Sequence, residues 1–334
     1  PRSTASPRIT PPTWPPMAEG ATQAPNRRRL AVAAGAVLLL AGLAAAALTM
    51  PDLRARAEAL AAALFGGGPD GAPLVIAVVG DLGEGGEPAD NAALEGARMF
   101  AERVNAAGGV RGRPLEIAAH DDDRDADRAR AVAREIAASG DVVAVIGHSV
   151  SDAAIPANAI YAEAGLPAIS VTATNPAVTA DNPWAFRAIF NDDRQAEILA
   201  NYARSVLGYQ SLAVVNTETT YARYLTRALR ENGEEIGLNI DPVYTLAAED
   251  DQVQRADIAR RLGLMTALDA VLLVIRPDQA EALVPLLRAQ GVEADLIGSD
   301  VLSLFGLSVG GEDGAERTPI PPHLEGALLT LPFL

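Results

Sequence analysis

Small hydroxyl side chains stand where two apolar, strand-like runs of the sequence end. Ser151 follows the run 142–146 and opens a helical stretch, while Thr172 and Thr174 follow the run 167–171. A helix N-terminus offers free N–H groups and a positive dipole end, which suit a carboxylate. A hydroxyl can donate and accept hydrogen bonds. These residues therefore predict a carboxylate-binding rim, although Ser151 could equally serve as a helix cap, and the two roles are compatible.

Other chemistries find little support in the residues. The glycines between Gly80 and Gly86 lack the spacing of a dinucleotide-binding loop, so no cofactor is expected. The acids 121–123 follow an extended segment and point in opposite directions, which indicates a solvated loop with a helix cap rather than a cation site. Ser149 and Ser151 follow His148 without the surroundings of a hydrolase nucleophile. Without cysteine and with three scattered histidines, neither an enzyme nor a metal protein is indicated.

Composition sets the broad class of the protein. The 334 residues suffice for two domains, and a hydrophobic content of 49% allows a sizeable core. Only 4% of the residues are aromatic, so alanine, valine and leucine must fill that core. The formal net charge of -16 opposes binding to phosphate backbones, which makes nucleic acid an unsuitable partner.

The N-terminal part of the sequence divides into three segments. Residues 1–29 are rich in proline, serine and threonine and are predicted to be disordered. The uncharged, mostly apolar run 30–50 follows three arginines and is long enough to span a bilayer. It fits a transmembrane anchor and a cleaved signal peptide equally well, and both place the rest of the chain outside the cytoplasm. Residues 51–73 are predicted to form a linker.

From Leu74 onward, apolar runs that predict buried strands alternate with helical stretches. This order is typical of an α/β fold with parallel sheets, in which ligands bind at the strand ends. The pattern starts again after residues 185–190, which are interpreted as a strand that crosses to a second lobe. We therefore expect two Rossmann-like lobes joined by crossover strands, the first formed by residues 74–191 and 325–334 and the second by residues 192–324.

Two stretches carry a resemblance to a known family. VNAAGGVRGRPLEI (residues 104–117) and VIGHSVSDAAIPANAIYAEAGLPAISVTATNP (residues 145–176) closely resemble type I periplasmic solute-binding proteins of the leucine/isoleucine/valine-binding branch. The resemblance covers residues 74–334 and implies two lobes that close over a small ligand. The C-terminal part of the family's chain is missing here, so the first lobe is expected to be incomplete and to expose apolar surface.

The resemblance also implies roles for individual residues. Ser151 falls on the serine that binds the ligand's carboxylate, Thr172 on a position that contributes backbone atoms, and Thr174 on a ligand-binding threonine. In the second half, Asp192 falls on an acidic cleft residue and Tyr221 on the tyrosine that closes over the ligand.

Two further positions that the resemblance selects carry charged side chains, which bear on the charge of the ligand. Asp300 falls on the acid that meets the ligand's ammonium group. Arg276 departs from the family, whose leucine-binding members have an aromatic residue there, and Ala222 replaces a glycine. Arg276 would pair either with a second carboxylate on the ligand or with Asp300 or Asp192. An amino acid or a more polar carboxylate ligand is therefore expected.

The function that the resemblance implies is capture of a small ligand outside the cytoplasm and its delivery to a membrane permease of the ABC type. No covalent chemistry and no cofactor are needed. A ligand-sensing ectodomain of a membrane-anchored receptor is the alternative, because an uncleaved helix at residues 30–50 would suit a protein that reports lobe closure across the membrane.

Overall fold

The computed structural model describes residues 72–83, 86–247, 252–302 and 324–330. The predicted disordered segment, the apolar run 30–50 and nearly all of the predicted linker lie outside the described residues. Among the helices that are described, none combines the length and the apolar character needed to cross a membrane.

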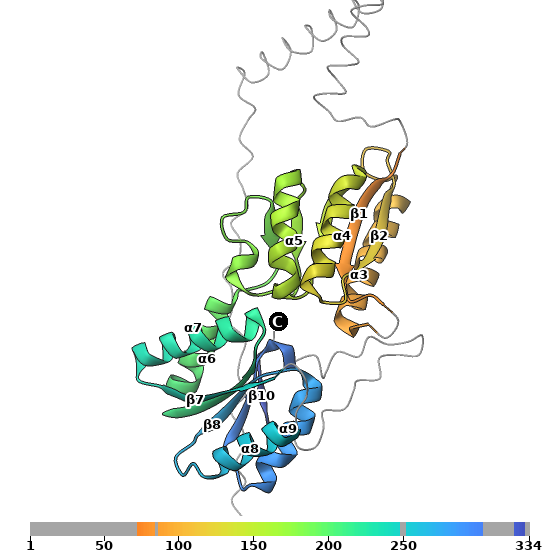
Figure 1. Cartoon of the computed structure of the whole chain (residues 1–334). Helices are drawn as coiled ribbons and strands as arrows, with labels where there is room; N and C mark the ends of the chain where they lie inside the picture. The colour runs from red at the N-terminus through yellow and green to blue at the C-terminus, as the bar shows by residue number, and fades with distance from the viewer. Residues whose placement is uncertain (1–71, 84–85, 248–251, 303–323, 331–334) are drawn as a thin grey trace, which may run out of the picture. The chain divides into compact units, whose positions relative to one another are not determined.

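The first lobe is built on a parallel sheet in the order β2-β1-β3-β4-β5 (Figure 1). Its strands are β1 (Leu74–Gly80), β2 (Leu115–Asp121), β3 (Val142–Ile146), β4 (Ala168–Ser170) and β5 (Ala185–Arg187). The apolar run 142–146 predicted β3 with its observed bounds, and β1 begins at Leu74 as expected, because central strands of a parallel sheet are apolar on both faces. The chain passes from β1 to its neighbour β2 and then crosses to β3 on the other side of β1. A switch point for ligand binding therefore lies between β1 and β3.

Three helices cover the first sheet: α3 (Pro88–Ala106), α4 (Ala126–Ser139) and α5 (Ser151–Ala164). Asp125 caps α4 by accepting hydrogen bonds from two first-turn N–H groups, and Gly140 ends that helix in the left-handed conformation. Helices α4 and α5 share one hydrophobic cluster with β1 and β3, in which Val79, Val145 and Tyr161 are buried.

The second lobe repeats this winding. Its parallel sheet has the order β10-β9-β8-β6-β7 and is formed by β6 (Ser211–Thr217), β7 (Asn239–Leu246), β8 (Ala270–Val274), β9 (Asp295–Gly298) and β10 (Leu328–Leu329). Read from β7 to β10, the strands follow the same second-first-third-fourth-fifth order as the first sheet. The second switch point therefore lies between β6 and β8.

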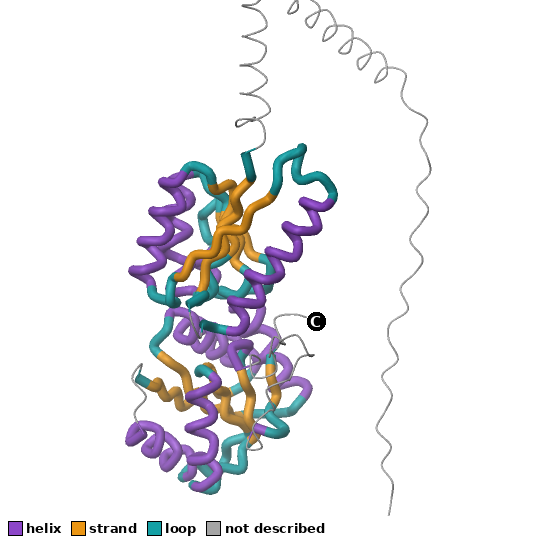
Figure 2. Tube along the Cα trace, turned by 90° about the vertical axis from the view of Figure 1, so that its right-hand side faces the viewer, coloured by secondary structure: helices purple, strands orange, loops and turns teal. Residues whose placement is uncertain are grey.

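Helices cover both faces of the second sheet (Figure 2). One face packs on α6 (Asp192–Asn201), which continues into a π-helical turn at Tyr202–Val206, and on α7 (Thr220–Ile236). The other face packs on α8 (Gln252–Gly263) and α9 (Pro277–Ala289). The structure thus confirms an α/β fold with two parallel, Rossmann-like sheets.

One of the sequence-based assignments of strands to lobes is wrong. Residues 185–187, interpreted as part of a crossing strand, pair in parallel with β4 in the first sheet, which agrees with the assignment of residues 74–191 to the first lobe. Leu328 and Leu329 pair with β9 and so belong to the second lobe, whereas the sequence assigned residues 325–334 to the first. A strand of two or three residues carries no pattern that identifies its neighbour. Tertiary packing determines the lobe of β10, because Leu329 lies against the hydrophobic cluster under the second sheet.

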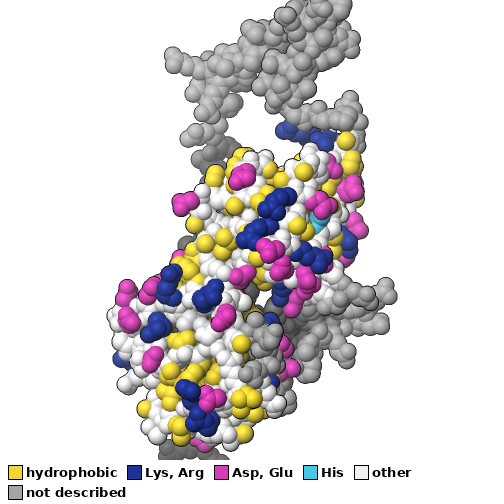
Figure 3. Space-filling model, in the orientation of Figure 1, with side chains coloured by type: hydrophobic (Ala, Val, Ile, Leu, Met, Phe, Trp, Pro, Cys, Tyr) yellow, Lys and Arg dark blue, Asp and Glu magenta, His cyan; other side chains and the backbone are white. Residues whose placement is uncertain are grey.

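The first lobe exposes apolar side chains, as expected. Val143, Ile169 and Phe186, on the adjacent strands β3, β4 and β5, are 43%, 39% and 50% exposed. On the face seen in Figure 3, acidic and basic side chains are interspersed.

Candidate ligand-binding site

Ser151 begins α5 directly beyond the carboxyl end of β3. The N-cap residue of the helix is Val150, whose side chain cannot accept a hydrogen bond from the first-turn N–H groups. Ser151 itself is 2% exposed, and its Oγ accepts a hydrogen bond from the backbone N–H of Asn175 over 3.3 Å. The interpretation of Ser151 as the helix cap is therefore wrong. The positive end of α5 is left without a side-chain acceptor, as an anion site requires.

The two threonines tie the loops after β3 and β4 together. The Thr172 hydroxyl donates to the carbonyl oxygen of Ser149 over 2.7 Å. Thr174 is buried, and its carbonyl oxygen accepts the backbone N–H of Asp192 over 3.0 Å. The structure thus places Ser151, Thr172 and Thr174 at one edge of the first sheet and links that edge to the start of α6.

An acidic cluster forms where α6, α7 and the segment after β9 meet. Asp192 at the first position of α6 is fully buried, and Asp300 is 9% exposed. Oδ1 of Asp300 accepts hydrogen bonds from the Tyr221 hydroxyl over 2.5 Å and from Nε2 of Gln195 over 3.0 Å. The three acidic and aromatic residues that the resemblance selected are thus brought together.

This cluster contains buried acceptors that lack donors. Neither carboxylate oxygen of Asp192 has a hydrogen-bond partner among the described residues, and the same is true of Oε1 of Gln195. The Thr174 hydroxyl lies near enough to influence Asp192 but makes no well-formed hydrogen bond with it. A buried polar atom without a partner is costly, so the cluster is suited to a guest that brings several N–H donors.

Burial dominates the electrostatics of the cluster. It raises the pKa of Asp192 to about 7; the Thr174 hydroxyl and Arg187 act in the opposite direction, and the charge of Asp300 adds to the rise. Burial also raises the pKa of Asp300, against the hydrogen bonds from Tyr221 and Gln195. An ammonium group placed among these residues would favour their ionised forms.

Arg276 is engaged elsewhere. Its Nε and Nη2 donate to the two carboxylate oxygens of Asp278 over 3.0 and 2.8 Å, and its side chain is 48% exposed. The expectation that Arg276 pairs with Asp300 or Asp192 is wrong. The reason is local: Arg276 is the N-cap residue of α9, and Asp278 lies in the first turn of the same helix.

Sequence reasoning missed the contacts that cross from one lobe to the other. Asp152, in the first turn of α5, accepts a hydrogen bond from the backbone N–H of Thr220 at the start of α7. Nδ2 of Asn175 donates to the carbonyl oxygen of Thr220 over 3.4 Å. In the sequence, the contact between the lobes was signalled only by an acidic residue, Asp152, next to Ser151. That residue type does not indicate a partner 68 residues away.

The prediction that residues 121–123 form a solvated loop holds only in part. Asp123 is exposed and Asp125 caps α4, but Asp122 is fully buried and contacts Nδ1 of His148 over 2.5 Å. Within the described residues, no group of histidines and acids is arranged to hold a metal ion.

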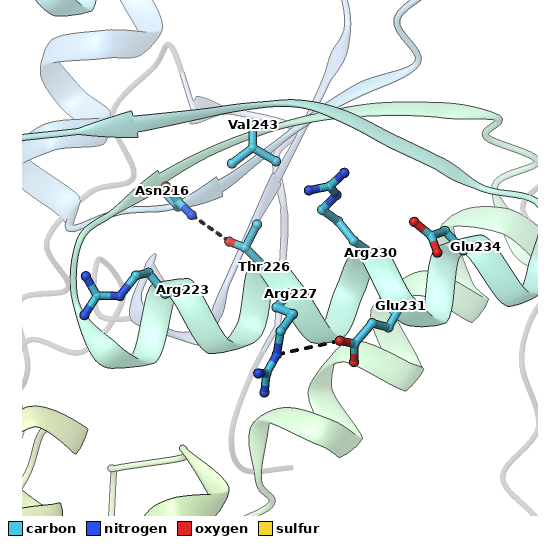
Figure 4. A pocket seen from close by; sticks show the side chains of 8 residues that line it. All are labelled: Asn216, Arg223, Thr226, Arg227, Arg230, Glu231, Glu234 and Val243. Atoms are coloured by element: carbon cyan, nitrogen blue, oxygen red, sulfur yellow. Dashed lines mark hydrogen bonds and ion pairs between the residues drawn. The ribbon is translucent and has the colours of Figure 1, made fainter.

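A separate groove of about 410 Å³ lies between α7 and β7 (Figure 4). It is lined by Asn216, Arg223, Thr226, Arg227, Arg230, Glu231, Glu234 and Val243. None of the predicted site residues belongs to this groove. Its arginines are exposed and two glutamates accompany them, so the groove is best interpreted as a solvated helix face.

A family model described as periplasmic binding protein matches residues 73–333. The chain belongs to the periplasmic binding protein family. An amino acid binding protein of Pseudomonas aeruginosa is 35% identical over 144 residues, which are 43% of this chain and 38% of the relative. A Leu/Ile/Val-binding protein homolog 1 of Brucella melitensis is 36% identical over 144 residues, with the same coverage. The matches thus span less than half the length of these relatives.

The fold agrees with solved members of the family. The substrate-binding protein of an ABC transporter from Desulfitobacterium hafniense, solved in complex with Leu, superposes with a TM-score of 0.58 at 23% identity, covering 70% of this chain and 68% of that one. This likeness establishes the fold. Periplasmic binding proteins of this family bind solutes and are not enzymes, in agreement with the sequence analysis.

Proposed function

We propose that this periplasmic binding protein is the extracytoplasmic component of an ABC transporter and captures a small amino acid between its two lobes. The observation that carries the proposal is the set of buried acceptors without donors on Asp192 and Gln195. An ammonium group supplies three N–H donors and a positive charge, which matches these acceptors and the nearby Asp300.

The carboxylate of an amino acid suits a site of opposite polarity to the acidic cluster. A carboxylate needs donors and positive potential, and the start of α5 at Ser151 offers both because no side chain caps the helix. Thr172 and Thr174 stand on the same rim. A zwitterion therefore matches the polarity of the two regions, with its carboxylate at the first lobe and its ammonium group at the acidic cluster.

The contacts of Arg276 narrow the class of ligand. A dicarboxylate would need a second cation near the site, and Arg276 already forms two hydrogen bonds with Asp278. Arg187, the cation that acts on Asp192, donates to the carbonyl oxygens of Ala173 and Asn175. An amino acid without a second carboxylate is therefore favoured, and the names of the relatives support this class.

Binding would proceed by lobe closure. The first lobe receives the carboxylate, and the second lobe closes with Tyr221 and Asp300. Closure removes water and so strengthens each charged hydrogen bond. Family membership supports a location outside the cytoplasm, and delivery to an ABC permease in the membrane follows from the proposed transport role.

A thermal-shift screen tests the proposal. The full chain is heated with each of the common amino acids, with dicarboxylates and with small amides. A ligand at 100 times its Kd stabilises the folded state by about 2.7 kcal/mol, which gives a clear rise in melting temperature. We expect the rise with neutral amino acids and not with dicarboxylates.

Two variants assign the rise to the site. Asp300→Ala should greatly reduce it, because the ammonium group loses one of the two carboxylates of the cluster. Asp257→Ala is the matched control, since Asp257 is an exposed acid on α8 that pairs with Arg260 and Arg261. A folded protein that responds to no amino acid, or an Asp300→Ala variant that responds like the parent, would contradict the proposal.

A further inference from the structure

Three polar side chains form a fully buried chain beneath the rim of the first lobe. Nδ1 of His148 lies 2.5 Å from Oδ2 of Asp122, and Nε2 of His148 lies 3.0 Å from the Tyr161 hydroxyl. All three residues are 0% exposed. Burying three polar groups is costly unless each is hydrogen-bonded, and here each has a partner.

The chain joins three separate elements at the switch point of the sheet. Asp122 directly follows β2, His148 lies in the turn between β3 and α5, and Tyr161 lies in the body of α5. The backbone N–H of Asp122 also donates to the carbonyl oxygen of Gly80, at the end of β1 between them. His148 thus connects the ends of the central strands to the helix whose first turn faces the site.

The turn that contains His148 is also held by hydrogen bonds of the next residue, Ser149. The Ser149 hydroxyl donates to Oδ2 of Asp90 over 2.8 Å, and the Ser149 carbonyl oxygen accepts the Thr172 hydroxyl. Two residues later the helix begins at Ser151. The position of the first N–H groups of α5 therefore depends on where His148 is held.

The hydrogen-bond partners of His148 determine which nitrogen of its ring carries the hydrogen. A carboxylate only accepts, so Nδ1 carries the hydrogen that faces Asp122, and we assign Nε2 as the acceptor of the Tyr161 hydroxyl. Burial, reinforced by the charge of Asp122, raises the pKa of Tyr161 well above its usual value, so the hydroxyl keeps its proton. One tautomer of His148 satisfies both contacts.

We propose that His148 is a positioning residue for the ligand's carboxylate, held by Asp122 and Tyr161 so that the first turn of α5 stays aimed at the site. It does not touch the ligand and acts through Ser149 and Ser151. The inference rests on the proposed function, because it assigns the carboxylate of the ligand to the start of α5.

Tyr161→Phe tests the proposal, since it removes one hydroxyl and leaves the packing of the ring in place. The dissociation constant for the amino acid that gives the largest thermal shift should rise about 3- to 10-fold, the effect of losing one buried hydrogen bond. Tyr209→Phe is the control, because it likewise removes one hydrogen-bonded tyrosine hydroxyl, whose partner is Asp295, in the second lobe away from the site. This control should leave the dissociation constant unchanged.

Two measurements without ligand separate this inference from the proposed function. In the parent protein, ¹⁵N chemical shifts should show hydrogen on Nδ1 of His148. Amide hydrogen exchange at residues 149–153 should be at least about 5-fold faster in Tyr161→Phe and unchanged in Tyr209→Phe.

The outcomes decide the two proposals independently. If no amino acid binds the parent protein, the proposed function fails, while faster exchange confined to residues 149–153 still supports the positioning role. If Tyr161→Phe binds ligand as the parent does and its exchange at these residues is unchanged, His148 only fills the core and the inference is overturned. Hydrogen on Nε2 of His148 in the parent would overturn the assigned contacts as well.

Discussion

Asp152 of the first lobe accepts the backbone N–H of Thr220 of the second lobe, with 3.1 Å from the nitrogen to each carboxylate oxygen. The Thr220 hydroxyl donates to the same carboxylate. Asp152 therefore binds the positive end of α7 from across the lobe boundary, next to the residue that begins α5. The residue that lies beside the proposed carboxylate site is thus also a contact that holds the two lobes together.

Asp152→Ala should loosen the lobe contact. Charge-assisted hydrogen bonds of this kind contribute about 1.5 to 3 kcal/mol, so their loss should favour separated lobes and raise the ligand's dissociation constant about 10-fold or more. Small-angle scattering of the ligand-free protein should show a larger radius of gyration. The control is Asp127→Ala on α4, because Asp127 is exposed and pairs with Arg130 within its own helix. Identical scattering and affinity in the two variants would contradict this role of Asp152.

Asp192 should make the ligand-free protein less stable as the pH rises. Its folded-state pKa of about 7 lies above the unfolded value of 3.8, so the folded state binds more protons between these values. Stability should therefore fall between about pH 4 and pH 7 and level off above, by up to roughly 4 kcal/mol from this group. Urea unfolding at pH 4.5, 6 and 8 measures the slope.

Asp192→Asn tests the assignment of that slope. The variant should have a smaller pH dependence and a higher stability than the parent at pH 8. Part of the slope should remain, because burial also raises the pKa of Asp300 and Asp90, which act in the same direction. A variant with the slope of the parent would show that Asp192 is not the titrating group.

Gly147→Ala should prevent normal packing at the switch point. A Cβ atom at Gly147 would lie 2.1 Å from the carbonyl oxygen of Val79, and φ there is +125°. Backbone cannot move aside cheaply, so we expect a loss of more than about 3 kcal/mol in the free energy of unfolding. Gly140→Ala is the control: φ is +74°, but the added Cβ meets nothing within 4 Å, and the cost should be roughly 1 kcal/mol. Equal losses in the two variants would show that the contact with Val79 does not matter.

Arg276→Ala should leave ligand binding within about 2-fold of the parent. The guanidinium contacts Asp278 at an exposed position, and pairs of this kind contribute at most about 1 kcal/mol to stability. Calorimetric titration with the best amino acid measures the affinity. A large loss would instead show that Arg276 leaves Asp278 and contacts the ligand, as one of the two sequence-based alternatives holds.

Patterns along the chain were sufficient for the larger features of the fold. Continuous apolar runs predicted β3 with its observed bounds and the start of β1 at Leu74, because the side chains of a central parallel strand are apolar on both faces. The start of α5 at Ser151 was also predicted as observed, and Gly165 ends the helix in the left-handed conformation. The resemblance then selected Asp192, Tyr221 and Asp300, which the structure brings together.

Tertiary structure alone decided the contacts between residues far apart in sequence. The sequence determined that Asp122 follows a strand and that His148 precedes a helix, but the parallel register of β1, β2 and β3 brings these two residues within 2.5 Å. The short strand β10 joined the second sheet for the same reason. Local patterns report which face of an element is buried, whereas the partner of a side chain depends on how distant elements pack.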